Sequence, residues 1–276
     1  MNSFLRNLYY RLPVTMRFHI RRIIFFPQDI FRDKSVLAPP KGLMFTGSGG
    51  FESVGKQFFN YFIQYGDITP DSAILDIGSG IGRMAVPFTN YLSKKGSYEG
   101  FDIVKIGVDW CKQNISSKYP NFNFKLIPLK NDLYLSDTNN TAENLVFPYK
   151  NDSFDFVFLT SVFTHMLPND VENYISEINR VLKPNKKFFA TFFILDEISK
   201  NAMISKGTKQ FPYEMENYSL MDKTVKEANV AYNKEYIINL LNENDFEVVQ
   251  FLRGNWSGTP SDIIDLHQDI IILKKK

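Results

Sequence analysis

The segment AILDIGSGIGR, residues 73–83, is the stretch on which the fold depends. Its apolar start, Ala73 to Leu75, predicts a buried strand, and three glycines then alternate with other residues. After Arg83, apolar residues recur at helical spacing up to Leu92, so a helix is expected to follow. A strand, a glycine turn and a helix can form a nucleotide-cofactor site. Glycine accepts positive φ, and the helix start offers unpaired N–H groups.

The spacing of the glycines distinguishes between cofactors. A dinucleotide fingerprint reads G-x-G-x-x-G, whereas this loop reads G-x-G-x-G, with Arg83 in the place of the third fingerprint glycine. The pattern resembles motif I of class I S-adenosylmethionine-dependent methyltransferases, whose loop passes under the methionine part of the cofactor. A glycine-rich turn without a ligand is the alternative. The resemblance implies that the cofactor is bound by Asp76, Gly78, Ser79, Gly80 and Gly82.

A second strand is expected at residues 97–103, with Asp102 near its end. A carboxylate at the tip of this strand can accept two hydrogen bonds from ribose hydroxyls. The sequence Gly-Phe-Asp-Ile resembles motif II of the same family, in which the residue after the acid, here Ile103, packs on adenine. The alternative is a chance aspartate at a strand end.

The third strand, expected at residues 122–126, departs from the family pattern. The family usually has an acid at the end of this strand that binds the adenine amino group, but Ile127 and Pro128 stand there. Asn131 or Asp132, a few residues later, is the expected substitute for this contact. A backbone group is the alternative.

Polar residues follow the fourth strand, which is expected at residues 156–160. Open α/β sheets bind ligands at the carboxyl ends of their strands, so Thr160 and Ser161 are expected to contact the cofactor. His165 is the candidate general base, because histidine titrates near neutrality and an acceptor hydroxyl or protonated amine can need a base. A structural histidine at the start of the next helix is the alternative. No grouping of His, Cys and Asp has metal-ligand spacing, so no metal is expected.

The order of motifs from about residue 43 to residue 274 resembles a class I S-adenosylmethionine-dependent methyltransferase of the bacterial small-molecule or glycan type. The resemblance implies an α/β, Rossmann-like fold: a seven-stranded, mostly parallel sheet with an antiparallel last strand and helices on both faces. We expect a methyltransferase domain at 43–276. An insertion at about 196–233 follows the fifth strand and would overhang the strand tips as a substrate cap.

Residues 1–42 are expected to form a separate N-terminal arm that is basic and amphipathic. Residues 1–34 contain seven basic residues and two aspartates, with aromatic and aliphatic residues between them. Such a segment can lie on an anionic membrane surface. The alternative is a helix that packs on the domain and keeps its arginines in solvent.

Charge and cysteine content restrict the partners and the compartment. A net charge of +2 over 276 residues argues against nucleic acid as a partner. The one cysteine excludes an intramolecular disulfide and fits a cytoplasmic location, including the inner face of the membrane. No stretch reaches the length of a transmembrane helix. The sequence makes no prediction of the oligomeric state.

The resemblance implies methyl transfer from S-adenosylmethionine to an oxygen or nitrogen acceptor, and we expect a glycan or lipid precursor as that small-molecule acceptor. A nicotinamide-dependent oxidoreductase is one alternative, which the glycine spacing and the reversed last strand disfavour. A cofactor-binding partner subunit without catalysis is the other.

Overall fold

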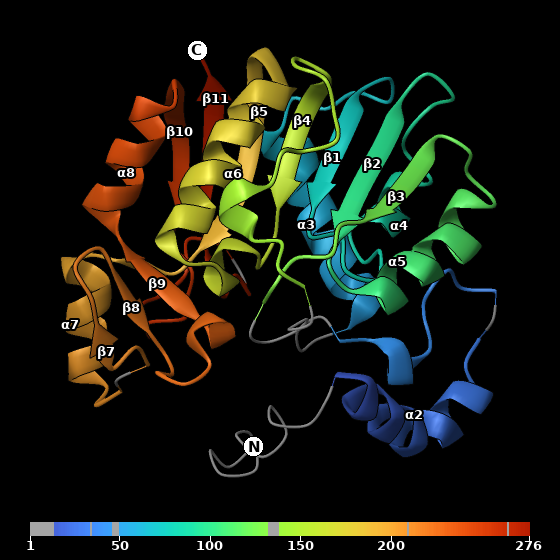
Figure 1. The fold of residues 1–276 in the computed structure, drawn as a ribbon, viewed down its shortest axis with the longest axis horizontal. Helices are drawn as coiled ribbons and strands as arrows, with labels where there is room; N and C mark the ends of the chain where they lie inside the picture. Colours follow the sequence, from blue (N-terminus) through green and yellow to red (C-terminus); the bar gives the residue numbers. More distant parts are fainter. Residues whose placement is uncertain (1–13, 34, 46–49, 132–137, 209, 264) are drawn as a thin grey trace.

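The computed structural model describes residues 14–33, 35–45, 50–131, 138–208, 210–263 and 265–276 (Figure 1). Within this described part, a seven-stranded sheet runs in the order β10-β11-β5-β4-β1-β2-β3. β11 is antiparallel to both of its neighbours, and the other pairs are parallel. This confirms the predicted fold class. The strands are β1 (Ala73–Ile77), β2 (Ser97–Asp102), β3 (Phe122–Leu126), β4 (Phe154–Leu159), β5 (Leu182–Phe192), β10 (Phe246–Leu252) and β11 (Asp269–Lys275).

Helices cover both faces of this sheet (Figure 1). Successive residues of a strand point to opposite faces, so Ile74 of β1 belongs to one apolar cluster and Leu75 to the other. The cluster of Ile74 includes side chains of α3, α4 and α5, and that of Leu75 includes side chains of α6 and α8. The helices are α3 (Phe51–Tyr65), α4 (Ala85–Phe88), α5 (Lys105–Cys111), α6 (Pro168–Val181) and α8 (Lys234–Glu243).

Three elements are irregular, and the first is shorter than the helix up to Leu92 that the sequence predicts. The helix after the glycine loop is only four residues long, and it contains Pro87, which has no N–H to continue the helical bonding. The helix after β2 changes after Cys111 into a π-helical segment, η2 (Lys112–Ser116). β5 begins already at Leu182, because an irregular pairing with β4 extends the strand.

A second, smaller sheet follows β5, in the region of the predicted insertion. Its order is β6-β9-β8-β7, and it packs with α7 and Trp256 around a separate apolar cluster. In Figure 1 it lies beside the β10–β11 side of the central sheet. The strands of this sheet are β6 (Ile194–Leu195), β7 (Tyr213–Glu214), β8 (Tyr218–Leu220) and β9 (Val230–Asn233), and the same region contains the helices α7 (Glu197–Ser205) and η5 (Lys226–Ala228).

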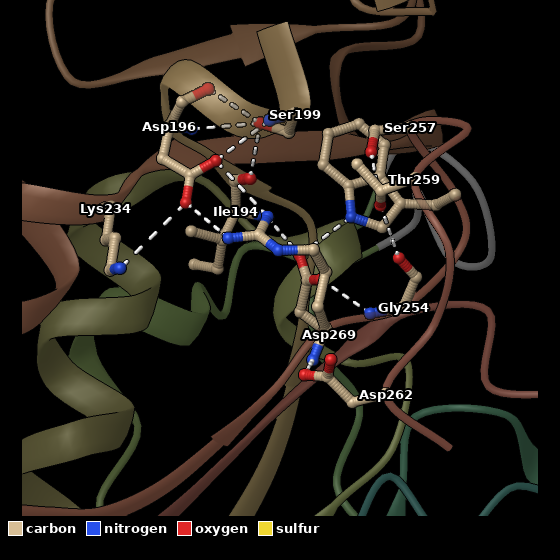
Figure 2. A network of polar contacts seen from close by, with 11 residues as sticks. Ile194, Asp196, Ser199, Lys234, Gly254, Ser257, Thr259, Asp262 and Asp269 are labelled. Carbon is tan, nitrogen blue, oxygen red and sulfur yellow. Dashed lines mark hydrogen bonds and ion pairs between the residues drawn. The ribbon is translucent and has the colours of Figure 1, made fainter. Parts of the chain in front are cut away.

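Asp269 joins the two sheets through a buried polar network (Figure 2). This residue begins β11 and is fully buried. Its carboxylate accepts hydrogen bonds from the N–H groups of Ile194 and Gly254, at 2.8 and 2.9 Å, and from the indole of Trp256 at 2.7 Å. Three donors on one carboxylate fix the start of β6 against the loop that follows β10.

An ion pair strengthens the same junction. Arg253 donates to both carboxylate oxygens of Asp196, at 3.2 and 2.6 Å. Asp196 is also the N-cap of α7, since its side chain accepts from the N–H of Ser199. The guanidinium and these backbone contacts lower the pKa of Asp196 against the effect of burial. The charged pair therefore ties the start of the insertion to the end of β10.

The N-terminal part of the described chain begins with α2 (Val14–Ile30) and the short 3-10 helix η1 (Lys41–Leu43). These two elements pack together at the lower edge of the molecule in Figure 1, where the parallel strands of the central sheet end. Two further 3-10 helices, η3 (Ala142–Asn144) and η4 (Phe163–His165), lie in the connections before and after β4. None of the described helices is long and apolar enough to cross a membrane.

Candidate active site

The glycine loop after β1 is shaped by left-handed backbone. The angle φ is 75° at Gly78, 55° at Gly80 and 78° at Gly82. Residues other than glycine rarely adopt such positive values. The N–H of Gly78 donates to the carbonyl of Phe101 at 2.9 Å. A Cβ at Gly78 would lie only 2.3 Å from Cγ2 of Val162. The loop therefore needs glycine both for its backbone and for its close approach to the segment after β4.

Asp102 ends β2 and holds this loop in place. Its Oδ2 accepts from the N–H of Gly80 and its Oδ1 from the N–H of Val104, both at 2.7 Å. The side chain is buried, and burial raises its pKa to about 6, although backbone N–H groups oppose the shift. Each carboxylate oxygen has a second lone pair, so Asp102 can still accept hydrogen bonds from a ligand.

A cavity of 740 Å³ opens beside the glycine loop, which is within the usual range for small-molecule sites. It gathers residues from the ends of β1, β2 and β4, far apart in the sequence. Of the residues predicted to form the site, those that line this cavity are Gly78, Ser79, Gly80, Asp102, Ile103, Asn131, Thr160, Ser161 and His165.

Asp76 and Gly82, also predicted to bind the cofactor, are not part of the cavity wall. Asp76 is buried, and its Oδ2 accepts from the hydroxyl of Tyr98 at 2.6 Å. A Cβ at Gly82 would meet Ile115 and Cys111 at 2.8 and 2.9 Å. Both residues support the glycine loop on the side away from the cavity, because their packing partners do not line the cavity.

The region next to Asp102 combines apolar side chains with an amide. Ile103, Val104 and Leu129 line the cavity here, together with the buried Asn131. Asp132, the other predicted adenine contact, lies outside the described residues. The structure thus brings Asn131 to the side of the cavity where an adenine contact was expected, and the contact itself stays a prediction.

The segment after β4 forms the next part of the wall. Ser161 has a φ of 58°, and its N–H donates to Oγ1 of Thr191 at 2.7 Å. Its hydroxyl donates to Oε1 of Gln268 at 3.0 Å. Left-handed backbone at a residue other than glycine is uncommon, and here the bonds to β5 and to the loop before β11 hold it. Thr160 and Ser161 therefore lie where strands β4, β5 and β11 meet.

His165 lies at the end of η4 and lines the same cavity. Its Nδ1 lies 2.9 Å from the carbonyl oxygen of Glu227 in η5. Burial lowers the pKa of His165, while the carbonyls of Glu227 and Ala228 act in the opposite direction. The insertion thus supplies the group that orients this histidine.

Sequence reasoning expected the insertion to overhang the strand tips, but it named none of the residues of the far wall of the cavity, which come from α3, from the end of β5 and the insertion, and from the loop before β11. The last of these could have been found, because an antiparallel strand begins at the edge where parallel strands end. The predicted reversal of the last strand therefore already placed its preceding loop at the site. The main missed residues are Gln57, Phe58, Phe193, Glu227, Asn229, Asp265, His267 and Gln268.

Residues 75–190 match a family model described as a methyltransferase domain. The matched stretch contains the glycine loop, Asp102, Thr160, Ser161 and His165. It therefore covers the part of the chain that forms the glycine-loop side of the cavity and carries the candidate base.

Solved structures share this fold. A methyltransferase from Methanosarcina mazei is 20% identical over 78% of this chain and 96% of its own, with a TM-score of 0.51. The PH0226 protein from Pyrococcus horikoshii is 16% identical over 85% and 95%, with a TM-score of 0.58. The 1,6-didemethyltoxoflavin-N1-methyltransferase from Burkholderia thailandensis, solved with S-adenosylhomocysteine bound, is 14% identical over 93% and 87%, with a TM-score of 0.51.

The domain match identifies residues 75–190 as a methyltransferase domain, and the sheet order and the glycine loop agree with a class I S-adenosylmethionine-dependent methyltransferase. The site fits this cofactor. Asp102 can accept from ribose hydroxyls, and Ile103 and Leu129 offer apolar surface to adenine. The hydroxyl oxygen of Ser79 is buried without a hydrogen-bond partner in the described part of the chain, as expected where a ligand group completes the site.

Proposed function

We propose that this methyltransferase acts on an oxygen or nitrogen atom of a small polar acceptor, such as a glycan or lipid precursor. The cavity wall beyond the glycine loop supports this proposal, because it carries Gln57, Asn229, Asp265 and Gln268. The three amides donate and accept hydrogen bonds and the carboxylate of Asp265 accepts them, as a hydroxyl- or amine-bearing acceptor requires. A purely hydrocarbon acceptor would desolvate these groups without replacing their hydrogen bonds, which is unfavourable.

The place and the tautomer of His165 carry the proposal. A carbonyl oxygen only accepts, so the contact with Glu227 puts a proton on Nδ1. In the neutral ring, the lone pair is then on Nε2. Because burial lowers its pKa below the usual 6.5, the ring is neutral at physiological pH. A neutral imidazole on the cavity wall can take a proton from an acceptor hydroxyl or ammonium group.

When bound, S-adenosylmethionine supplies a methyl group on a positively charged sulfur, which leaves as a neutral sulfide. The chain then has to orient the cofactor and the acceptor and to exclude water from the cavity. Asp102 and the glycine loop fix the cofactor side, and Phe58 and Phe193 give the wall its apolar surface. Orientation of this kind can account for about 7–11 kcal/mol of a barrier. His165 contributes the proton acceptor.

The experiment compares His165→Ala with His267→Ala, a second histidine of the cavity wall. Transfer of tritium from labelled cofactor is measured across a panel of hydroxyl- and amine-bearing sugars and lipid headgroups. We expect His165→Ala to lower turnover by about two to four decades and to leave affinity for S-adenosylhomocysteine unchanged. His267→Ala should keep most activity. The wild-type rate should fall in acid with a midpoint below 6.5, and His165→Ala should lose this dependence.

Three results would contradict the proposal. Folded His165→Ala with wild-type turnover and pH profile would remove the base. Cofactor binding without transfer to any acceptor of the panel would indicate a non-catalytic partner subunit. Transfer to a carbon atom of an apolar acceptor would show that the polar wall has another purpose.

A further inference from the structure

Helix α2 turns its apolar face to solvent. Ile23 is 76% exposed, and its apolar neighbours on the same face are exposed as well. With 3.6 residues per turn these side chains form one continuous stripe along the helix. The exposed members of this stripe are Met16, Ile20, Ile23, Ile24, Phe26 and Ile30, and Phe31 continues it beyond the helix.

The opposite side of α2, which faces the domain, is largely polar. Arg21 donates to the carbonyl of Met44. Asp29 accepts from the N–H groups of Lys41 and Gly42, at 2.6 and 3.0 Å. A surface helix normally buries its apolar face and exposes its charges. In α2 this arrangement is reversed, because hydrogen bonds attach the polar face to η1 and leave the apolar face outside.

The charges of this segment have one dominant sign. Residues 14–33 contain four arginines and two aspartates. Arg21 and Asp29 are both turned toward the domain. The half-buried Arg17 and the exposed Arg22 lie at helical positions on either side of the apolar stripe. An apolar stripe between arginines is complementary to an anionic bilayer. Apolar groups enter the acyl region, and the cations meet the headgroups.

We propose that α2 is a membrane-binding helix that lies in the headgroup region of an anionic bilayer. In Figure 1 it lies along the outer edge of the molecule, at the end of the sheet that carries the cavity. Phe18 of α2 packs edge-on against Phe45 at 5.5 Å, and Phe45 lines the cavity. The bilayer would therefore lie close to the site. The proposal does not depend on the chemistry of the acceptor.

The test uses the full chain and vesicles of phosphatidylcholine with phosphatidylglycerol, with sedimentation as the readout. Ile23→Glu is compared with Ile204→Glu, because Ile204 of α7 is also 76% exposed. We expect wild type to bind at low salt and to dissociate as salt rises. Ile23→Glu should weaken binding roughly tenfold or more, and Arg22→Gln about fivefold. Ile204→Glu should bind like wild type.

Several outcomes would overturn the proposal. One is that the wild-type chain does not bind anionic vesicles at low salt. Another is that Ile23→Glu and Ile204→Glu weaken vesicle binding equally, which would show that exposed apolar residues promote binding wherever they lie on the surface. A third is a dimer in sedimentation velocity that Ile23→Glu dissociates while vesicle binding is absent. In that case a second copy of the chain, and not lipid, covers the helix.

Discussion

Asp76 and Asp102 lie on neighbouring strands beside the glycine loop, yet their surroundings assign them different tasks. Asp102 lines the cavity and bonds two backbone N–H groups. Asp76 is turned away and bonds only the hydroxyl of Tyr98 among the described contacts. Asp102 is therefore the carboxylate that faces the cavity, whereas Asp76 is a buried support of the loop.

Asp102→Ala should weaken affinity for S-adenosylhomocysteine by about one to two decades, because a hydrogen bond to a charged group contributes roughly 1.5–3 kcal/mol. Isothermal titration calorimetry measures this loss. Asp102→Asn is the matched control, since its side-chain oxygen can still accept from Gly80, and it should lose less. Equal affinity in wild type and a folded Asp102→Ala would show that the ribose is bound elsewhere.

Asp76→Asn should change how stability depends on pH. Burial raises the pKa of Asp76 to about 7, against the bond from Tyr98 and with some help from Asp102. The unfolded chain releases this proton near its ordinary value of 3.8. Between these values the folded state binds more protons, so its stability falls as pH rises, by about 1.4 kcal/mol per pH unit. Asparagine, which is neutral throughout, removes this loss.

Urea unfolding of wild type and Asp76→Asn at pH 5 and pH 7 checks this prediction. The difference in unfolding free energy should shift in favour of the variant by roughly 2–3 kcal/mol over that interval. A difference that is the same at both pH values would mean that Asp76 does not titrate in this range.

At the scale of elements, the sequence predicts the ends of those strands that are bounded by turn residues. β3 spans Phe122–Leu126, the range that its sequence predicts, because Asn121 before it and Pro128 after it are turn residues. The small strands β7 and β8 have two and three residues, too few for a pattern, and their pairing depends on β9. α2 shows another limit. Its periodicity defines an apolar face, but only tertiary contacts decide that this face points outward.

At the scale of the whole molecule, the sequence predicts some residues of the cavity wall and not others. Gly80, Asp102 and Thr160 were predictable because each follows a strand in a motif whose place in the sheet is known. Phe193 and Glu227 were not, because the sequence placed the insertion over the strand tips but could not tell which residues of it, or of the strand end before it, tertiary contacts bring to the cavity. The part of the cavity wall that the insertion contributes therefore depends on how firmly the small sheet is held to the central sheet.

Arg253→Met should loosen this junction. The side chains of Arg253 and Asp196 are 12% and 14% exposed, so loss of the guanidinium leaves a mostly buried carboxylate with fewer partners. The expected cost is about 1–3 kcal/mol in unfolding free energy. Trypsin should cut faster at the exposed Lys223 and Lys226 of the insertion. Affinity for S-adenosylhomocysteine should stay unchanged, since the glycine loop does not contact the pair.

Lys187→Met is the control for this prediction, because Lys187 makes an ion pair with Asp67 at 2.7 Å on the central sheet. Asp67 is 69% exposed, so this pair should contribute at most about 1 kcal/mol, and cleavage of the insertion should not change. If Arg253→Met and wild type are cut at the same rate, the ion pair does not hold the insertion. The three hydrogen bonds to Asp269 would then be sufficient to join the two sheets.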